Sequence, residues 1–213
     1  MPQQKLLCRK VSKGYGKGMK ILGLTGGMGM GKSTVATLLR HAGLPVFDAD
    51  AEVRHLQADH GAALPAIAQL VPHAVQNGHL DRAVLRQAVI KEPALLKKLE
   101  QIIHPMVRAA RAKFLRAQRL RGARCVVLDI PLLYETGAQR ECDDVLVVSA
   151  PHWVQARRVA KRRGMPPAEA CKLIARQMPD AQRVRQAGKV IRTGGSMRET
   201  ERQVRQFIRS LRA

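Results

Sequence analysis

The chain has 213 residues, 46% of them hydrophobic, so it can bury a sizeable core and is not a disordered tail. It contains no run of roughly 18 apolar residues and no apolar N-terminal signal, so we expect a cytoplasmic protein without a membrane span. The formal net charge of +22 suits nucleic acid, an anionic membrane face or highly phosphorylated small molecules, and charge alone does not choose among them.

The first 19 residues differ in composition from the rest of the chain. They carry five basic residues, three glycines and no acidic residue, which predicts a flexible basic arm. The remaining residues, 20–213, are predicted to form a single domain.

Residues 20–50 have the pattern of a strand, a loop, a helix and a second strand. Residues 20–25 (KILGLT) are short and apolar, residues 26–33 are rich in glycine, and residues 33–43 are amphipathic and stop at a glycine. Residues 44–50 (LPVFDAD) form a second apolar run that carries two aspartates at its end. Such a unit predicts an α/β fold, with a parallel sheet flanked by helices.

The rest of the chain alternates between helical and strand patterns. Residues 51–121 show apolar residues three or four apart and no strand signal, so we predict a helical substrate-binding insertion in which Pro105 interrupts the longest helix. Residues 124–130 and 143–149 are apolar, β-branched runs typical of buried parallel strands. Residues 152–187 return to helix, and residues 189–193 suit a short last strand. Residues 196–213 suit a closing helix that Ser196 caps, with Glu199 three positions on.

The glycine-rich loop carries the strongest functional signal in the chain. Its sequence, GGMGMGKS, satisfies the phosphate-binding pattern GxxxxGK[ST] and lies between an apolar strand and an amphipathic helix, as that motif requires. Glycines let the backbone wrap phosphates with its N–H groups pointing inward. Lys32 is expected to reach the β- and γ-phosphates, and the Ser33 hydroxyl to bind Mg²⁺. The predicted ATP-binding residues are Gly26, Gly27, Met28, Gly29, Met30, Gly31, Lys32, Ser33, Thr34 and Arg162.

A phosphate-binding loop is shared by kinases, GTPases, motors and transporter subunits, so further motifs must decide. The chain lacks the guanine-reading NKxD of GTPases. It also lacks the apolar strand followed by Asp-Glu that a motor or transporter subunit would carry. A small-molecule kinase is the interpretation that remains.

Such a kinase needs a carboxylate at the carboxyl end of a strand to accept the proton of the attacking hydroxyl. Asp48 and Asp50 alternate along the second predicted strand, so both would face one side, with Asp50 as the base and Asp48 near the acceptor or Mg²⁺. The alternative for either residue is an N-cap of the next helix. Asp129 ends the third strand and is predicted to join Ser33 at the magnesium ion, or else to hydrogen-bond the loop. Glu135 lies in the same neighbourhood.

The segment 152–187 is rich in arginine, and its cations occupy several faces of the predicted helices. Solvated charge is the ordinary explanation for such a run. We favour a lid that closes over ATP and supplies arginines to the charge that develops during phosphoryl transfer. Arg158 is the predicted catalytic arginine, and Arg162 the predicted ATP contact.

Several motifs together resemble the dephospho-coenzyme A kinase family over about residues 20–210. They are GLTGGMGMGKSTVA, FDAD, the pair His104-Pro105, DIPLLYE, the series Gln155, Arg158, Arg162, and ARQMP, in this order. The resemblance implies transfer of the ATP γ-phosphoryl group to the ribose 3′-hydroxyl of dephospho-coenzyme A. Asp50 then matches the family's proposed base, and Lys32 and Ser33 its phosphate and magnesium contacts. His104 and Arg108 fall in the substrate-binding region.

Three positions depart from the family pattern. Gly188 stands where an acid is usual and Thr193 where an amide is usual, so adenine contacts inferred from this stretch are not carried over. Arg183 stands where lysine is common, which keeps the charge but changes its geometry. The basic arm also lies outside the pattern.

Two alternative functions stay open. One is another P-loop kinase for a nucleoside, nucleotide or small alcohol, and the other is a basic nucleic-acid-binding protein that retains a phosphate loop. The leading hypothesis requires ATP, Mg²⁺ and dephospho-coenzyme A, and no obligate nucleic acid. The sequence does not predict an oligomeric state.

Deleting residues 1–18 tests the proposed boundary of the arm. Because the predicted domain starts at residue 20, we expect the truncated protein to keep the turnover of the full chain within about twofold. Steady-state ADP release from the two proteins measures this. A tenfold loss would assign the arm to the active site.

Overall fold

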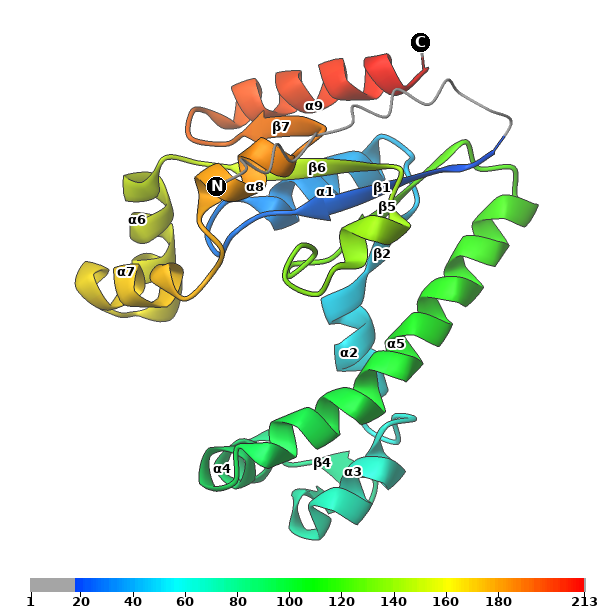
Figure 1. Ribbon diagram of the computed structural model, residues 1–213, viewed down its shortest axis with the longest axis vertical. Coiled ribbons are helices and arrows are strands. Elements are labelled where there is room, and N and C mark those ends of the chain that lie inside the picture. Colours follow the sequence, from blue (N-terminus) through cyan, green and yellow to red (C-terminus); the bar gives the residue numbers. More distant parts are fainter. Residues whose placement is uncertain (1–17, 213) are drawn as a thin grey trace, which may run out of the picture.

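The computed structural model describes residues 18–212, so the predicted arm lies outside the described residues except for its last two. A five-stranded sheet forms the centre, with strand order β2-β5-β1-β6-β7 and every neighbouring pair parallel (Figure 1). The strands are β1 (Lys20–Thr25), β2 (Val46–Asp48), β5 (Cys125–Asp129), β6 (Asp144–Ser149) and β7 (Lys189–Arg192). The prediction of a parallel sheet flanked by helices is confirmed.

Each face of the sheet is covered by its own apolar cluster. Helices α1 (Lys32–His41) and α9 (Met197–Arg212) pack with Leu146 and Val148 of β6 in one cluster. Val145 and Val147 belong to the other, which includes Val184 of α8 (Asp180–Gln186). Because side chains alternate along a strand, successive β6 residues face opposite clusters, and the strand is buried on both sides.

Residues 49–120 form a lobe with its own apolar cluster, at the lower end of the molecule in Figure 1. It contains helices α2 (Ala49–Leu56), α3 (Leu64–Leu70), α4 (Arg82–Lys91) and α5 (Ala94–Leu120), and the 3-10 turn η1 (Pro72–Ala74). This lobe corresponds to the segment predicted as a helical insertion.

The expectation of no strand in this segment is wrong. Strands β3 (Val75–Gln76) and β4 (His79–Leu80) pair as an antiparallel hairpin. Its turn, Asn77-Gly78, has positive φ at both residues (50° and 77°), the geometry for which Asn-Gly is suited. Strands of two residues are too short to show an alternating pattern, so only the turn could have signalled them.

The expected interruption at Pro105 is also wrong, because α5 continues through it from Ala94 to Leu120. Figure 1 shows this helix bending part-way along its length rather than ending. A proline inside a helix lacks one backbone donor and strains the preceding turn. The helix is anchored to α2 and α3 by buried residues before the proline, Leu95, Leu99 and Ile103. This packing stabilises the helical conformation on both sides of Pro105.

The segment between β6 and β7 begins with two helices that pack against each other, α6 (His152–Arg163) and α7 (Pro167–Ala175). Figure 1 shows this pair projecting from one end of the sheet. Gly164 ends α6 in the left-handed conformation, with φ 62°. Whether the pair moves as a lid stays a prediction.

Helix α9 begins with the predicted serine cap. The backbone N–H of Glu199 donates to the Ser196 hydroxyl at 3.2 Å, which confirms the predicted cap of α9. A 3-10 turn, η2 (Ala138–Glu141), connects β5 to β6. No helix in residues 18–212 is long and apolar enough to cross a membrane.

Two thiols, that of Cys125 in β5 and that of Cys142 just after η2, make the stability of the fold depend on pH. Burial raises the pKa of Cys125 and of Cys142 from 9.0 to about 11. The folded state therefore holds these protons more tightly than the unfolded chain. This contribution to stability is complete below pH 9 and is lost as the pH rises through 11.

We therefore expect the free energy of unfolding to fall between pH 9 and pH 11, and to fall less in the double variant Cys125→Ala/Cys142→Ala. Urea unfolding at several pH values measures both slopes. Tyr134, whose pKa burial raises to about 12, supplies a residual slope in both proteins. Equal slopes would mean that the thiols are solvated.

Candidate active site

The phosphate-binding loop joins β1 to α1 at the carboxyl edge of the sheet. Gly31 precedes α1 with φ 85°, and no side chain caps the N–H groups of the first helical turn. A Cβ at Gly26 would lie 2.7 Å from the carbonyl oxygen of Val148, so only glycine fits this close approach. The uncapped amides and the helix dipole make this loop an anion-binding site.

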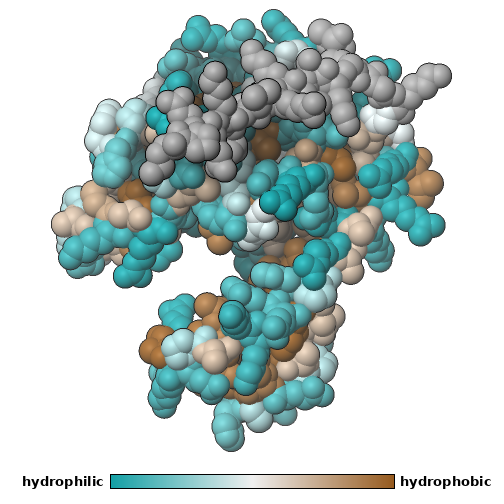
Figure 2. Space-filling view, viewed as in Figure 1, coloured by the Kyte–Doolittle hydropathy of each residue, from teal (hydrophilic) through white to brown (hydrophobic). Residues whose placement is uncertain are grey.

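A cavity of about 1110 Å³ opens beside the loop. Figure 2 shows a hollow on this side of the molecule, between the α2–α5 lobe and the body above it. Basic side chains outnumber acidic ones on the cavity wall: it is lined by Lys32, Arg40, Arg54, Arg158, Arg162 and Arg163, and by Asp48, Asp50 and Asp129. This surplus of positive charge suits a ligand with several phosphates.

Lys32 and Asp129 form a tight ion pair in the cavity wall, with Nζ and Oδ1 2.6 Å apart. Asp129 ends β5 and is only 3% exposed. Burial raises the pKa of its carboxyl, and the adjacent Lys32 ammonium opposes that shift. The pair holds Lys32 at the mouth of the loop and keeps a carboxylate beside it.

Asp48 and Asp50 both line the cavity, but the reasoning that placed them on one face of a strand is wrong. Strand β2 ends at Asp48, and Asp50 lies in the first turn of α2. The Asp48 carboxylate caps α2 by accepting from the Ala51 N–H at 2.8 Å, as the alternative interpretation held. The Asp50 side chain is exposed and makes no hydrogen bond or ion pair with the described part of the chain, so its carboxylate is free to meet a substrate.

Arg158 and Arg162 extend from α6 into the same cavity. The Arg158 guanidinium donates to the carbonyl oxygen of Thr193 at 2.7 Å and to its hydroxyl at 3.1 Å. The Thr193 hydroxyl in turn donates to the carbonyl oxygen of Met30 at 2.6 Å. Thr193, one of the three residues that depart from the family pattern, thus connects the predicted lid to the loop.

The structure does not bring every predicted residue to the cavity. His104 and Arg108 are exposed on α5, one turn apart, and lie outside its lining. Met30 is 2% exposed, and its Sδ accepts from the Ala150 N–H at 3.0 Å, so its side chain is part of the core. Gly26, Gly27, Met28, Gly29, Gly31, Ser33 and Thr34 do line the cavity.

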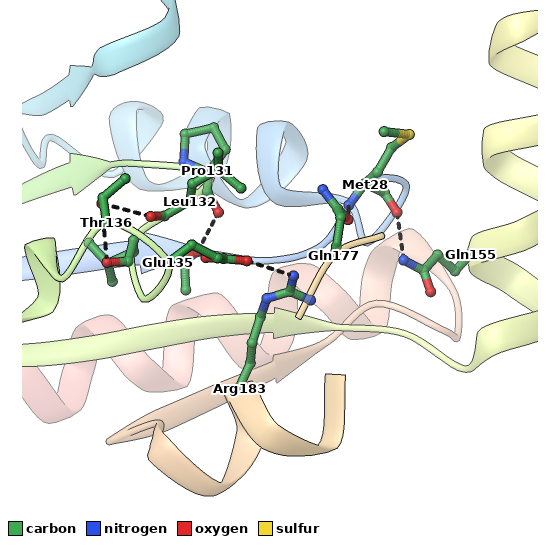
Figure 3. A network of polar contacts seen from close by, with 10 residues as sticks. Met28, Pro131, Leu132, Glu135, Thr136, Gln155, Gln177 and Arg183 are labelled. Atoms are coloured by element: carbon green, nitrogen blue, oxygen red, sulfur yellow. Dashed lines mark hydrogen bonds and ion pairs between the residues drawn. The ribbon is translucent and has the colours of Figure 1, made fainter. Parts of the chain in front are cut away.

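The residues that hold the loop from behind stand in the motifs of the family resemblance or at a departure from it, but the sequence indicated no role for them. Gln155 and Gln177 hydrogen-bond the backbone of Met28, and Arg183, 2% exposed, pairs with Glu135 at 3.2 Å (Figure 3). The two glutamine contacts span more than a hundred residues of sequence, so nothing local indicates which backbone groups these amides bind. Arg40 and Arg54 were missed as well, because single arginines at helix ends are common.

The fold and this loop define a P-loop phosphotransferase: a parallel sheet, a phosphate-binding loop before α1 and a cationic cavity with a free carboxylate. The description "Dephospho-CoA kinase" belongs to the family whose sequence profile matches residues 20–199. This chain is a member of that family. Its reaction, ATP-dependent phosphorylation of dephospho-CoA, is the one predicted from the sequence, and it is favoured over the alternatives.

Individual relatives agree with this assignment. Dephospho-CoA kinase from Gluconobacter oxydans is 50% identical over 198 residues, which cover 91% of this chain and 98% of the relative. A crystal structure from Thermus thermophilus superposes with a TM-score of 0.76 at 36% identity, covering 90% of this chain and 97% of the other. Dephospho-CoA kinase from Campylobacter jejuni shares the fold, with a TM-score of 0.68 at 19% identity and coverage of 90% and 96%.

Gly31 provides a test of the backbone cradle. In Gly31→Ala, the Cβ would lie 3.1 Å from the Thr193 hydroxyl at a φ of +85°. The loop must then shift, and we expect nucleotide affinity to fall at least about tenfold. Calorimetric titration with a non-hydrolysable ATP analogue measures the loss.

Gly43 is a matched control, because it has the same φ of +85° and nothing lies within 4 Å of its Cβ position. Gly43→Ala should therefore cost roughly 1–2 kcal/mol of stability and leave nucleotide affinity unchanged. Unaltered affinity in Gly31→Ala would show that the amides of this loop do not hold the phosphates.

Proposed function

We propose that this cavity transfers the γ-phosphoryl group of ATP to the ribose 3′-hydroxyl of dephospho-CoA, with Asp50 as the general base. The observation that carries the proposal is the shared wall: the phosphate-binding loop and the free Asp50 carboxylate line one cavity. An acceptor hydroxyl between them would be close to both the γ-phosphorus and a proton acceptor.

The loop and the cationic side chains bind the triphosphate in this proposal. The backbone amides at the start of α1 hydrogen-bond the β- and γ-phosphates. The Lys32 ammonium, which contacts Asp129 without nucleotide, turns toward the phosphate oxygens. Arg158 and Arg162 stabilise the negative charge that grows on the transferred group. Their lining of the cavity supports these roles.

Asp50 accepts the proton of the 3′-hydroxyl while the hydroxyl oxygen attacks the γ-phosphorus. The bond between the γ-phosphorus and the bridging oxygen breaks, and ADP leaves with the electron pair. Arg54, one helical turn after Asp50 on the same cavity wall, is placed to attract a phosphate of the acceptor.

The oxygen ligands at the loop fit Mg²⁺. Ser33 is exposed and its hydroxyl makes no side-chain hydrogen bond within residues 18–212, and the carboxylates of Asp129 and Asp48 end neighbouring strands in register. No group of three His, Cys, Asp or Glu side chains in that range forms a metal cage. This suits a cation held largely by phosphates and water. Bound there, Mg²⁺ would neutralise charge on the β- and γ-phosphates.

The α2–α5 lobe is the proposed docking surface for the rest of the acceptor. His104 and Arg108 present a basic strip on α5, which follows α2 and Asp50 in the same lobe. We assign the protein to the cytoplasm, where ATP and Mg²⁺ are available together.

Replacing Asp50 by Asn tests the base. The variant keeps the size and polarity of the side chain but cannot take a proton, so turnover should fall about a hundredfold or more while ATP affinity stays within about threefold. Glu52→Gln removes a neighbouring first-turn acid that does not line the cavity, and it should retain parental turnover.

ADP release in the presence of dephospho-CoA, adenosine or AMP measures both base and acceptor. Near-normal turnover of Asp50→Asn would remove Asp50 from the role of base. ADP release with AMP or adenosine, but not with dephospho-CoA, would contradict the proposed acceptor.

A further inference from the structure

Two glutamine side chains form hydrogen bonds with the peptide groups on either side of Met28. The Gln155 amide nitrogen donates to the Met28 carbonyl oxygen at 2.9 Å, and the Met28 N–H donates to the Gln177 amide oxygen at 2.8 Å (Figure 3). A backbone N–H only donates and a carbonyl only accepts, so these partners fix which way each amide points. Gln155 serves here as a donor, and Gln177 serves as an acceptor.

The two glutamines come from opposite ends of the α6–α7 pair. Gln155 lies near the start of α6 and is 3% exposed, while Gln177 follows α7 and precedes α8. The first turn of α6 and the segment after α7 are therefore both hydrogen-bonded to one residue of the phosphate-binding loop. The far end of the pair, with Lys161, Arg162 and Arg163, is exposed.

The neighbouring Gly27 shows how closely these side chains surround the loop. A Cβ there would lie 3.1 Å from Gln155 Nε2, 3.1 Å from Arg183 Nη1 and 3.4 Å from Gln177 Oε1. Arg183 is buried and is held by Glu135 at 3.2 Å. Three polar side chains thus converge on the back of the loop, and their hydrogen bonds to the Met28 backbone and to Glu135 limit how far the loop can move there.

We propose that Gln155 and Gln177 are positioning residues that fix the base of the α6–α7 pair to the phosphate-binding loop. Because both ends of the pair are held at Met28, the pair pivots about this residue. The pivot fixes how closely Arg158 and Arg162 approach the phosphates. Loss of either bond loosens the arginines relative to the nucleotide. The proposal rests on the phosphoryl transfer assigned above, for which these arginines stabilise the developing charge.

Isosteric substitutions distinguish this role from space filling. Gln177→Glu keeps an oxygen acceptor for the Met28 N–H, whereas Gln155→Glu places a carboxylate against the Met28 carbonyl oxygen and removes the donor. We expect kcat of Gln155→Ala, Gln155→Glu and Gln177→Ala to fall about tenfold to a hundredfold. Gln177→Glu should recover most of the activity that Gln177→Ala loses.

The KM for dephospho-CoA should change little in all four variants, since neither glutamine belongs to the α2–α5 lobe. Gln186→Ala, at an exposed glutamine of α8 that makes no hydrogen bond to the loop, is the control for general effects and should behave as the parent. Thermal unfolding of every variant shows whether it folds.

Limited trypsin digestion provides a readout that does not depend on the acceptor. ATPγS with Mg²⁺ should slow cleavage at Lys161, Arg162 and Arg163 in the parent, and should protect Gln155→Ala much less. If the parent protein does not phosphorylate dephospho-CoA, the proposed function is wrong. The digestion still tests whether Gln155 couples nucleotide binding at the loop to the position of the α6–α7 pair. Equal activities of the two Glu variants, or equal protection of parent and Gln155→Ala, would overturn the proposal.

Discussion

The phosphate-binding loop must follow a backbone path that leaves almost no room for side chains, and the rest of the active site depends on this constraint. Gly29 and Gly31 have φ of 76° and 85°, and Gly26 lies against the backbone of β6. Because glycine has no side chain, these residues cannot hold the loop in place by side-chain packing. The shape of the loop is therefore maintained by groups that reach it from elsewhere in the chain.

Those groups come almost entirely from the sequence after β6. Thr193 bonds the carbonyl oxygen of Met30, Gln155 and Gln177 bond the backbone of Met28, and Arg158 bonds Thr193. The segment that carries Arg158 and Arg162 thus also supplies Gln155 and Gln177, which bond the loop. The same few hydrogen bonds therefore connect the phosphate-binding loop to the helix that carries Arg158.

The distribution of charge fits this arrangement. Six basic side chains line the cavity and only three carboxylates oppose them, so the site is electrostatically incomplete without an anion. Two of these cations are already paired within the cavity wall: Lys32 with the buried Asp129 carboxylate at 2.6 Å, and Arg40 with Asp48 at 3.5 Å. A part of the net charge of +22 is therefore accounted for by polyphosphate substrates.

The sequence by itself determined the sheet, the loop and the chemical class of the protein. Apolar runs at strand length and the GxxxxGKS pattern are local signals, so the existence of the five sheet strands and of the loop follows from the sequence, although the end of β2 does not. Only the tertiary structure decided the position of Asp50, which depends on where β2 ends and α2 begins, and the path of α5 past Pro105, which depends on buried packing. It also decided the contacts of Gln155 and Gln177 with Met28, because hydrogen bonds between residues so distant in sequence leave no periodic trace in the chain.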